Sequence, residues 1–412
     1  MTADHEERRT TYAVRLVIAG MGFNLLLCLF SAHVHAINAN EVTAVEVAIL
    51  AAALPLAWGD FDTDLFCAAG LLAGWLLAVH LIDAKLGEQT FVILAIPVIY
   101  FTLGRRWGSP QVADRLVMGM AVAVLAFGVF EMCEPALYER LLNVLAYYLD
   151  KGVLKPDQAH VTGTQFFVSG IRPAGEGRSL LPMLGDHRAS SIFLEPISLG
   201  DFAVIAAMWG LVRHEANPRL GKALIAIGLA IAVLADSRLA VGTILAIALA
   251  LATPLPGVKV GLLLMPAAVV LFLLYVGFTF GLRPVDDTLG GRLYSSGTLL
   301  AGWGLGQWFG VATSGRPVYD CGYAQLISGL GVIPALVLWA VLAFWPGQNR
   351  LFDRYRCALA VYLCVSLAIT GSVLSIKTGA LAWFLLGAAE QRVAQVARRS
   401  LFLDNYQGAS TT

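Results

Sequence analysis

Apolar runs of helical length recur along this 412-residue chain, and they constrain its fold more than any other feature. Each run has about 15 to 24 residues, roughly what a helix needs to cross a hydrocarbon core. Hydrophobic residues make up 58% of the chain and charged residues 14%, with a mean hydropathy of +0.73. A soluble protein does not need so many uninterrupted apolar stretches. The sequence therefore predicts an all-α, polytopic integral membrane protein.

We predict twelve spans in a single transmembrane domain, residues 1–412. The spans lie at roughly 12–35, 42–58, 63–82, 90–104, 112–132, 192–212, 220–235, 239–253, 258–280, 322–345, 355–371 and 374–391. Two connections, 133–191 and 281–321, are long, and the others are short, as expected between antiparallel neighbours. The first run follows a charged segment and lacks a small-residue cleavage pattern, so we expect a spanning helix and not a cleavable signal peptide.

Basic residues in the short connections indicate the orientation. With the amino terminus inside, the basic clusters of the termini and of three short connections all fall on the cytoplasmic side, as the positive-inside rule requires. These residues are Arg8, Arg9, Arg105, Arg106, Arg115, Arg213, Arg219, Lys222, Arg350, Arg354, Arg356, Arg392, Arg398 and Arg399. Both termini are then cytoplasmic, and both long connections are outside.

The two long connections are rich in arginine. The first contains Arg172, Arg178 and Arg188, and the second contains Arg283, Arg292 and Arg316. Long loops translocate despite positive charge, so any one of these residues can be an ordinary solvated arginine. The guanidinium group, however, is a rigid fork that suits phosphate and carboxylate. Six arginines on one face therefore favour a bound polyanion at the outer membrane face.

Ionisable residues also gather in the outer halves of the expected spans. They are Glu46, His80, Glu131, Glu195, Asp201, Asp236, Arg238 and Lys377. Such residues cost several kcal/mol inside a membrane and by default mark function. Their distribution favours an aqueous cavity that opens outward under the long connections. The alternative is that several are interfacial residues, beyond the true ends of their spans.

The stretch GDHRASSIFLEPISLG, residues 185–200, places four ionisable groups at the start of the sixth span. Proline disfavours helical geometry in the residue before it and is tolerated in the first helical turn, so we expect a helix from Pro196. Glu195 would lie just outside that helix, near its positive end, where a carboxylate can accept a proton or simply cap the helix. His187 is either a catalytic group or a surface histidine, and Arg188 is placed to meet a phosphate at the membrane surface.

Two further segments of the long connections have helical patterns. Residues 289–303 are apolar and weakly amphipathic, which predicts an interfacial helix followed by a flexible turn at 302–306. That turn is not a dinucleotide fingerprint, because no strand precedes it. Residues 134–150 place Leu137, Leu141, Leu145 and Tyr148 on one helical face, for an interfacial helix or for core packing.

Charge and cysteine content argue against several classes of function. The chain has 28 basic and 28 acidic residues, so no bulk charge points to nucleic acid. The six cysteines show no CxxC spacing, which predicts neither a zinc site nor a disulfide framework, and we expect no metal and no cofactor. Cys28, Cys67, Cys357 and Cys364 lie in apolar runs and are expected in the core. A pairing of Cys133 with Cys321 stays open.

Four motifs, in order, resemble the bacterial O-antigen ligase and polymerase superfamily, and most of all its exopolysaccharide polymerase branch. They read HRASSIFLEPISLG, DSRLAVGTILAIAL, GGRL with GWGLGQ, and DCGYAQLISGLGVIP, and they cover roughly residues 185–345. The matching residues are Arg188, Ser191, Phe193, Glu195, Pro196, Arg292, Gly302 to Gly306, Asp320, Gly322 and Tyr323.

The resemblance implies a GT-C-like membrane fold with two large periplasmic loops, in the bacterial inner membrane. It implies a metal-independent glycosyltransferase that moves a growing glycan from undecaprenyl pyrophosphate onto a sugar hydroxyl of the next lipid-linked repeat unit. Beyond that lipid-linked oligosaccharide, the partners implied are a flippase and chain-length or export proteins. The ligase branch relies on a loop histidine as base, for which His187 could stand in, although it lies directly beside Arg188.

The chemistry assigns roles to these residues. Guanidinium groups at the leaving pyrophosphate would stabilise the charge that grows there, and a carboxylate or imidazole would take the proton of the acceptor. Arg188 and Arg292 are expected to hold the pyrophosphate, and Glu195 is the first choice for the base, before His187 and Asp320. Supporting substrate-binding residues are Arg172, Arg178, Arg238, Arg283, Arg316, Asp201 and Lys377, the last of which could instead snorkel.

Three other functions stay open. A secondary transporter with twelve spans should show repeat symmetry and broken helices at matching positions, but long connections after the fifth and ninth spans fit no simple halving. A ligase would move the finished glycan to another acceptor. A subunit of an export complex would have no catalytic activity of its own.

Overall fold

The computed structural model describes residues 3–58, 63–82, 88–154, 164–172, 177–253, 258–280, 288–312, 318, 321–347 and 349–390. Within these residues all regular secondary structure is helical, with an isolated β-bridge between Ile171 and His187. The all-α prediction is confirmed.

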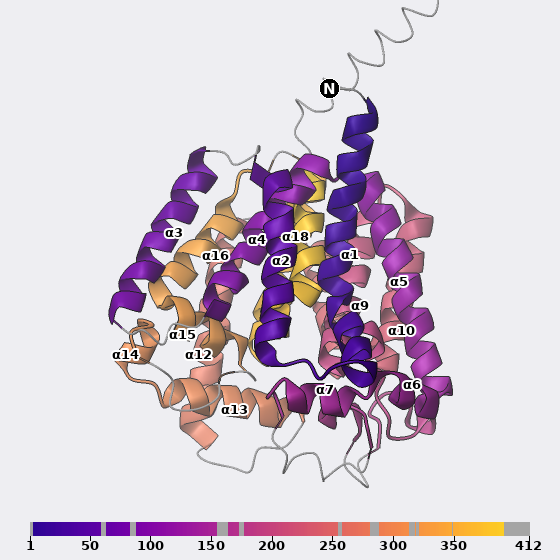
Figure 1. Ribbon diagram of the computed structural model, residues 1–412. Helices are drawn as coiled ribbons and strands as arrows, with labels where there is room; N and C mark the ends of the chain where they lie inside the picture. The colour runs from indigo at the N-terminus through magenta and orange to yellow at the C-terminus, as the bar shows by residue number, and fades with distance from the viewer. Residues whose placement is uncertain are drawn as a thin grey trace, which may run out of the picture.

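Long helices run side by side between two faces of the molecule (Figure 1). They are α1 (Ala3–His33), α2 (Ala39–Ala57), α3 (Thr63–Ile82), α4 (Glu88–Trp107), α5 (Pro110–Cys133), α9 (Pro196–Arg213), α10 (Pro218–Leu234), α11 (Arg238–Ala252), α12 (Val258–Phe280), α15 (Gly322–Leu330), α16 (Val332–Phe344), α17 (Arg350–Leu367) and α18 (Ile376–Glu390). We call the face where α1 begins the amino-terminal face, and the opposite face, where α6 (Pro135–Leu142), α7 (Val144–Asp150) and α13 (Leu289–Ala301) lie, the loop face.

Several of these helices are apolar enough to cross a membrane. By length and composition, six of the described helices qualify, or seven if the pair α15 and α16, bent by 112°, counts as one span. The six are His5–His33, Ala39–Ala57, Thr90–Trp107, Pro110–Cys133, Pro196–Arg213 and Lys259–Thr279. Each of the twelve ranges predicted from the sequence falls on a helix, and the tenth falls on the bent pair. The apolar helices indicate a membrane protein in contact with lipid.

Helices α9 and α18 form the buried centre of the bundle. Nearly all described side chains of both helices are buried. Small residues allow their neighbours to approach closely: a Cβ on Gly104 of α4 would lie 2.0 Å from the carbonyl oxygen of Phe384 in α18. In the same way, a Cβ on Gly228 of α10 would lie 2.8 Å from the Ala203 oxygen in α9. Close packing through glycine is typical of helices in membranes.

The structure confirms some local predictions and corrects others. Helix α9 begins at Pro196 and α13 covers 289–301, as predicted. The single amphipathic helix predicted over 134–150 is wrong, because the chain breaks at Asn143, whose φ is +41°, into α6 and α7. Leu137 and Leu141 are therefore exposed, whereas Leu145 and Tyr148 are buried. Cys133 and Cys321 do not form a disulfide with each other: the first is exposed and the second is buried.

Candidate functional site

The turn between α10 and α11 is the anchor of the site. Asp236, in this turn, has a φ of +48° and a side chain that is buried. Its carboxylate accepts hydrogen bonds from Arg172 Nε at 2.9 Å and Nη2 at 2.8 Å, and from the backbone N–H groups of Ser179 and Leu180 at 3.2 and 2.6 Å. Burial alone would raise the pKa of Asp236, but these N–H groups and Arg172 hold it below its ordinary value. Asp236 therefore fixes the first long connection to the bundle as an ionised group.

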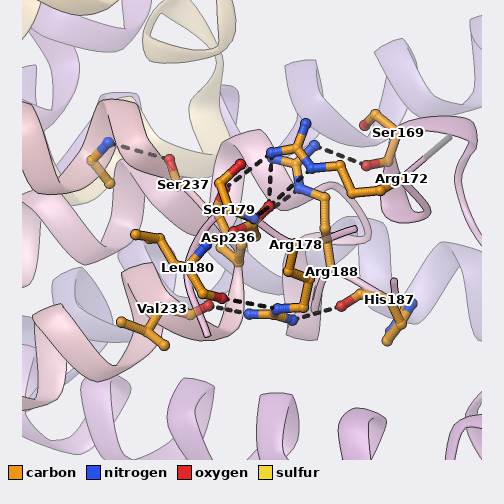
Figure 2. A network of polar contacts seen from close by, with 12 residues as sticks. Ser169, Arg172, Arg178, Ser179, Leu180, His187, Arg188, Val233, Asp236 and Ser237 are labelled. Carbon is orange, nitrogen blue, oxygen red and sulfur yellow. Dashed lines mark hydrogen bonds and ion pairs between the residues drawn. The ribbon is translucent and has the colours of Figure 1, made fainter. Parts of the chain in front are cut away.

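Two more arginines of the same connection are buried beside this turn (Figure 2). Arg178 donates to the carbonyl oxygens of His187 at 2.6 Å and Leu234 at 3.2 Å, and also to that of Val233. These last two carbonyls close the carboxyl end of α10, where a cation is favoured by the helix dipole. Arg188 donates to Ala235 O at 3.1 Å and to Ser169 O at 3.0 Å.

Four arginines from separate parts of the chain line one cavity. The cavity lies between α9, α11, α13 and α17, at the end of α9 that is nearest the loop face. Its charged residues are Arg172, Arg188, Asp201, Asp236, Arg238 and Arg292. The described lining has four guanidinium groups and two carboxylates, with Arg238 exposed and Arg292 half-buried, and guanidinium groups suit a phosphate or carboxylate. The volume of about 70 Å³ is room for a few water molecules or a small anionic group.

Asp201 is the carboxylate of the cavity that projects from α9. Its side chain is buried and accepts a hydrogen bond from the hydroxyl of Ser372, which follows α17. Ser366 and Thr370, near the end of α17, line the same cavity. These small polar side chains and Asp201 form one wall of the cavity, so that a second carboxylate, besides that of Asp236, lies among the arginines.

Glu131, at the end of α5, holds the segment that carries Arg188. Its buried carboxylate accepts hydrogen bonds from Ser190 N at 2.9 and 3.0 Å and from Ser191 N at 2.6 Å. The Nε2 atom of His187 lies 3.0 Å from the same carboxylate. His187 therefore faces α5 and does not line the cavity, so the geometry gives it a positioning role.

Glu195 lies on the other side of the start of α9, in a second polar cluster. Its carboxylate is 3.2 Å from Lys377 Nζ and accepts hydrogen bonds from the Tyr148 hydroxyl at 2.5 Å and the Ser198 hydroxyl at 2.9 Å. The carboxylate makes no capping hydrogen bond to α9, so the interpretation as a simple helix cap is wrong. Burial would raise the pKa of Glu195, but Lys377, Tyr148, Lys151 and Ser198 hold it below its ordinary value.

The predicted site residues thus separate into three groups. Arg172, Arg188, Asp201, Arg238 and Arg292 come together in the cavity. The residues Arg178, His187, Glu195 and Lys377 do not line it, and make the contacts given above. The predicted residues Arg283, Arg316 and Asp320 lie outside the described residues.

The sequence pattern missed several residues of both clusters. Tyr148 was assigned only to a helical face, yet its hydroxyl bonds to Glu195. The sequence pattern predicts no role for Lys151, whose ammonium lies 5.7 Å from the centre of the Tyr148 ring. Ser366, Thr370 and Ser372 were also overlooked, although three small polar residues within an apolar run are a detectable signal for a polar site in a membrane.

Comparisons with protein-family models, with curated proteins and with solved structures find no match for this chain.

Proposed function

We propose that this protein is a polysaccharide polymerase that transfers a growing glycan from undecaprenyl pyrophosphate to the next lipid-linked repeat unit. The observation that carries the proposal is the arginine cavity, which four guanidinium groups line at the loop-face end of a helical membrane protein. The order of the sequence motifs supports the choice of glycan transfer over other chemistry at a lipid phosphate.

The cavity would bind the anionic leaving group. Arg188 and Arg292 reach it from the two long connections, so both connections would close around one pyrophosphate, with Arg238 at the start of α11 beside them. Fixed guanidinium groups favour the transition state, because negative charge on the pyrophosphate grows as the anomeric bond breaks. Arg172 is already paired with Asp236 and would support the site by holding its wall.

The proton acceptor in this proposal is Asp201. It lines the cavity from α9, whereas Glu195 faces the other cluster and Asp236 is held by Arg172 and two N–H groups. In the reaction, the bond between the anomeric carbon and the pyrophosphate oxygen breaks, and its electron pair stays on the pyrophosphate. The acceptor hydroxyl oxygen forms the new bond to the anomeric carbon, and its proton passes to the carboxylate.

We also propose how the chain crosses the membrane and in which membrane it lies. Twelve spans with both termini in the cytoplasm would place the loop face, and with it the cavity, in the periplasm of a bacterium, at the inner membrane. The basic residues at the amino-terminal face, such as Arg106 and Arg213, support this orientation. The substrate lipid would then present its pyrophosphate at the level of the cavity.

The test is synthesis from a defined substrate. Purified protein in vesicles is incubated, without added metal, with undecaprenyl-pyrophosphate-linked repeat units from its own host, and the products are separated by size. A ladder of repeat units is expected for the wild type, and a strongly reduced one for Arg188→Ala and Asp201→Asn in the same reaction time. Glycan that appears only on an added core acceptor would replace this proposal by a ligase. If neither product forms from competent substrate, the proposal is overturned.

A further inference from the structure

An apolar groove lies between α2, α3 and α4, away from the arginine cavity. Its volume is about 330 Å³, and every described side chain that lines it is apolar. Leu54 and Trp58 of α2, Leu72 and Leu76 of α3, and Phe91 and Val98 of α4 form its walls. Apart from the indole N–H of Trp58, no described side chain of this lining can hydrogen-bond to water, so the groove suits an apolar occupant.

Described side chains of α3 pack against α4 and α15. The indole N–H of Trp75 donates to the carbonyl oxygen of Leu330, at the bend between α15 and α16, at 2.7 Å. Leu76 packs in a small cluster with Leu94 and the same Leu330. These contacts hold α3 at α15, and the space between α3 and α2 is left to the groove. Figure 1 shows α3 at the edge of the bundle.

Basic and aromatic residues gather beside the end of the groove at the amino-terminal face. The carbonyl oxygen of Leu56, between the groove residues Leu54 and Trp58, accepts hydrogen bonds from Arg106 Nη1 at 3.3 Å and Trp107 Nε1 at 3.0 Å. The guanidinium groups of Arg106 and Arg9 lie 5.0 and 5.5 Å from the centre of the Trp107 ring. Trp58 is 65% exposed. This pattern of arginine and tryptophan is typical of the level of lipid head groups.

We infer that this groove binds an anionic phospholipid, with one acyl chain between α2 and α3 and the phosphate against Arg9 and Arg106. The chain matches the apolar lining, and the phosphate matches the two guanidinium groups at its end. This lipid is not the proposed substrate, because the arginine cavity lies at the opposite, loop-face end of the bundle. Its bound chain would fill the gap beside α3.

The experiment is native mass spectrometry of the full-length protein titrated with phosphatidylglycerol or with phosphatidylcholine of the same acyl chains. Each arginine near the phosphate contributes about fivefold in affinity, so the first lipid should bind about 30-fold more tightly than the second. The double variant Arg9→Gln, Arg106→Gln should remove this preference. Arg350→Gln is the matched control, because Arg350 pairs with Glu215 away from the groove and should leave the preference intact.

A second pair of variants tests the groove itself. Ala73→Leu with Ala95→Leu adds side chains to the lining and should abolish retention of phosphatidylglycerol. Gly119→Leu on α5, where an added Cβ meets nothing within 4 Å, adds similar bulk elsewhere and should not. Equal binding of both lipids overturns the inference, and so does unchanged binding in the filled groove. A lipid-free dimer that the filled groove abolishes would overturn it too, since a second copy would then cover this face. None of these outcomes depends on glycan synthesis, so the proposed function is tested separately.

Discussion

Two polar clusters flank the start of α9, and they differ in charge balance. The arginine cavity has four guanidinium groups and two carboxylates, contributed by both long connections and by α9 and α11. The Glu195 cluster has two lysines, Lys151 and Lys377, and two carboxylates, Glu46 and Glu195, which lie close enough to interact electrostatically. In the first cluster the described arginines outnumber the carboxylates around a cavity, and in the second the lysines and carboxylates are equal in number and Glu195 is bonded within the cluster.

This difference distinguishes a candidate binding site from a structural cluster at the start of α9. Residues 197, 200, 201 and 204 of α9 face the cavity, whereas Glu195 and Ser198 face α7 and α18. A cavity lined by several guanidinium groups suits an anionic ligand, whereas a cluster whose charges pair with one another is satisfied without one. We therefore propose that the cavity binds the ligand and that Glu195 joins α7, α9 and α18.

Removal of one cavity arginine should give the largest effect. Arg188→Ala is expected to lower the rate of glycan polymerisation about 1,000-fold, because loss of a fixed donor at a developing anion costs this order of magnitude. Arg188 also bonds to two backbone carbonyls, so Arg188→Lys, which keeps the charge and loses the fork, is the second variant. Initial rates in vesicles measure both. A rate within threefold of wild type in a folded Arg188→Ala protein would remove the cavity from the mechanism.

The carboxylates of Glu195 and Asp201, at the start of α9, provide a sharper test of how the two clusters differ. Asp201→Asn should lower the rate about 100-fold, as expected for loss of a general base, while the pair Glu195→Gln with Lys377→Met should retain most of it. The measurement is the initial rate together with the thermal midpoint, so that a loss of folding is recognised. The reverse result, an active Asp201→Asn and an inactive double variant, would return the base to Glu195.

The helices and the start of α9 follow from local patterns that the sequence displays. Apolar runs fix helix positions because each backbone group in lipid must be satisfied within its own helix, and Pro196 sets the start of α9 by its own geometry. Which side of α9 a residue faces is a different question. Glu195 and Asp201 are six residues apart, and only the packing of α7, α11, α17 and α18 decides that they enter different clusters.

The sequence also could not predict which role each arginine has. Arg172, Arg178 and Arg188 are equivalent in composition, yet only the fold pairs Arg172 with Asp236 and places Arg178 at the end of α10. The break at Asn143 escaped detection because Leu and Tyr at helical spacing outweigh one asparagine, although asparagine tolerates the left-handed conformation. Contacts between distant segments thus decide what periodicity cannot.

Loss of one member of the balanced cluster should reduce stability. Lys377→Met leaves the carboxylate of Glu195, 22% exposed, without its direct cation, and should lower the free energy of unfolding by about 3 kcal/mol. Adding Glu195→Gln should recover most of this loss, because the unpaired charge is then removed. Unfolding by denaturant in detergent measures both variants. If the double variant is no more stable than Lys377→Met, the cluster is not held together by charge balance.

The smallest expected effect is a pH dependence due to Lys151. Burial, together with the like charge of Lys377, lowers the pKa of Lys151 from 10.5 to about 8, although Glu195 and Glu46 oppose the shift. Between these two pH values the unfolded chain binds more protons than the folded protein, so the contribution of Lys151 to stability rises with pH across this window. The thermal midpoint of the wild type, measured against that of Lys151→Met from pH 7.5 to 10.5, should therefore increase with pH. A difference that stays flat would mean that Lys151 is solvated, and the balanced cluster would then end at Glu195 and Lys377.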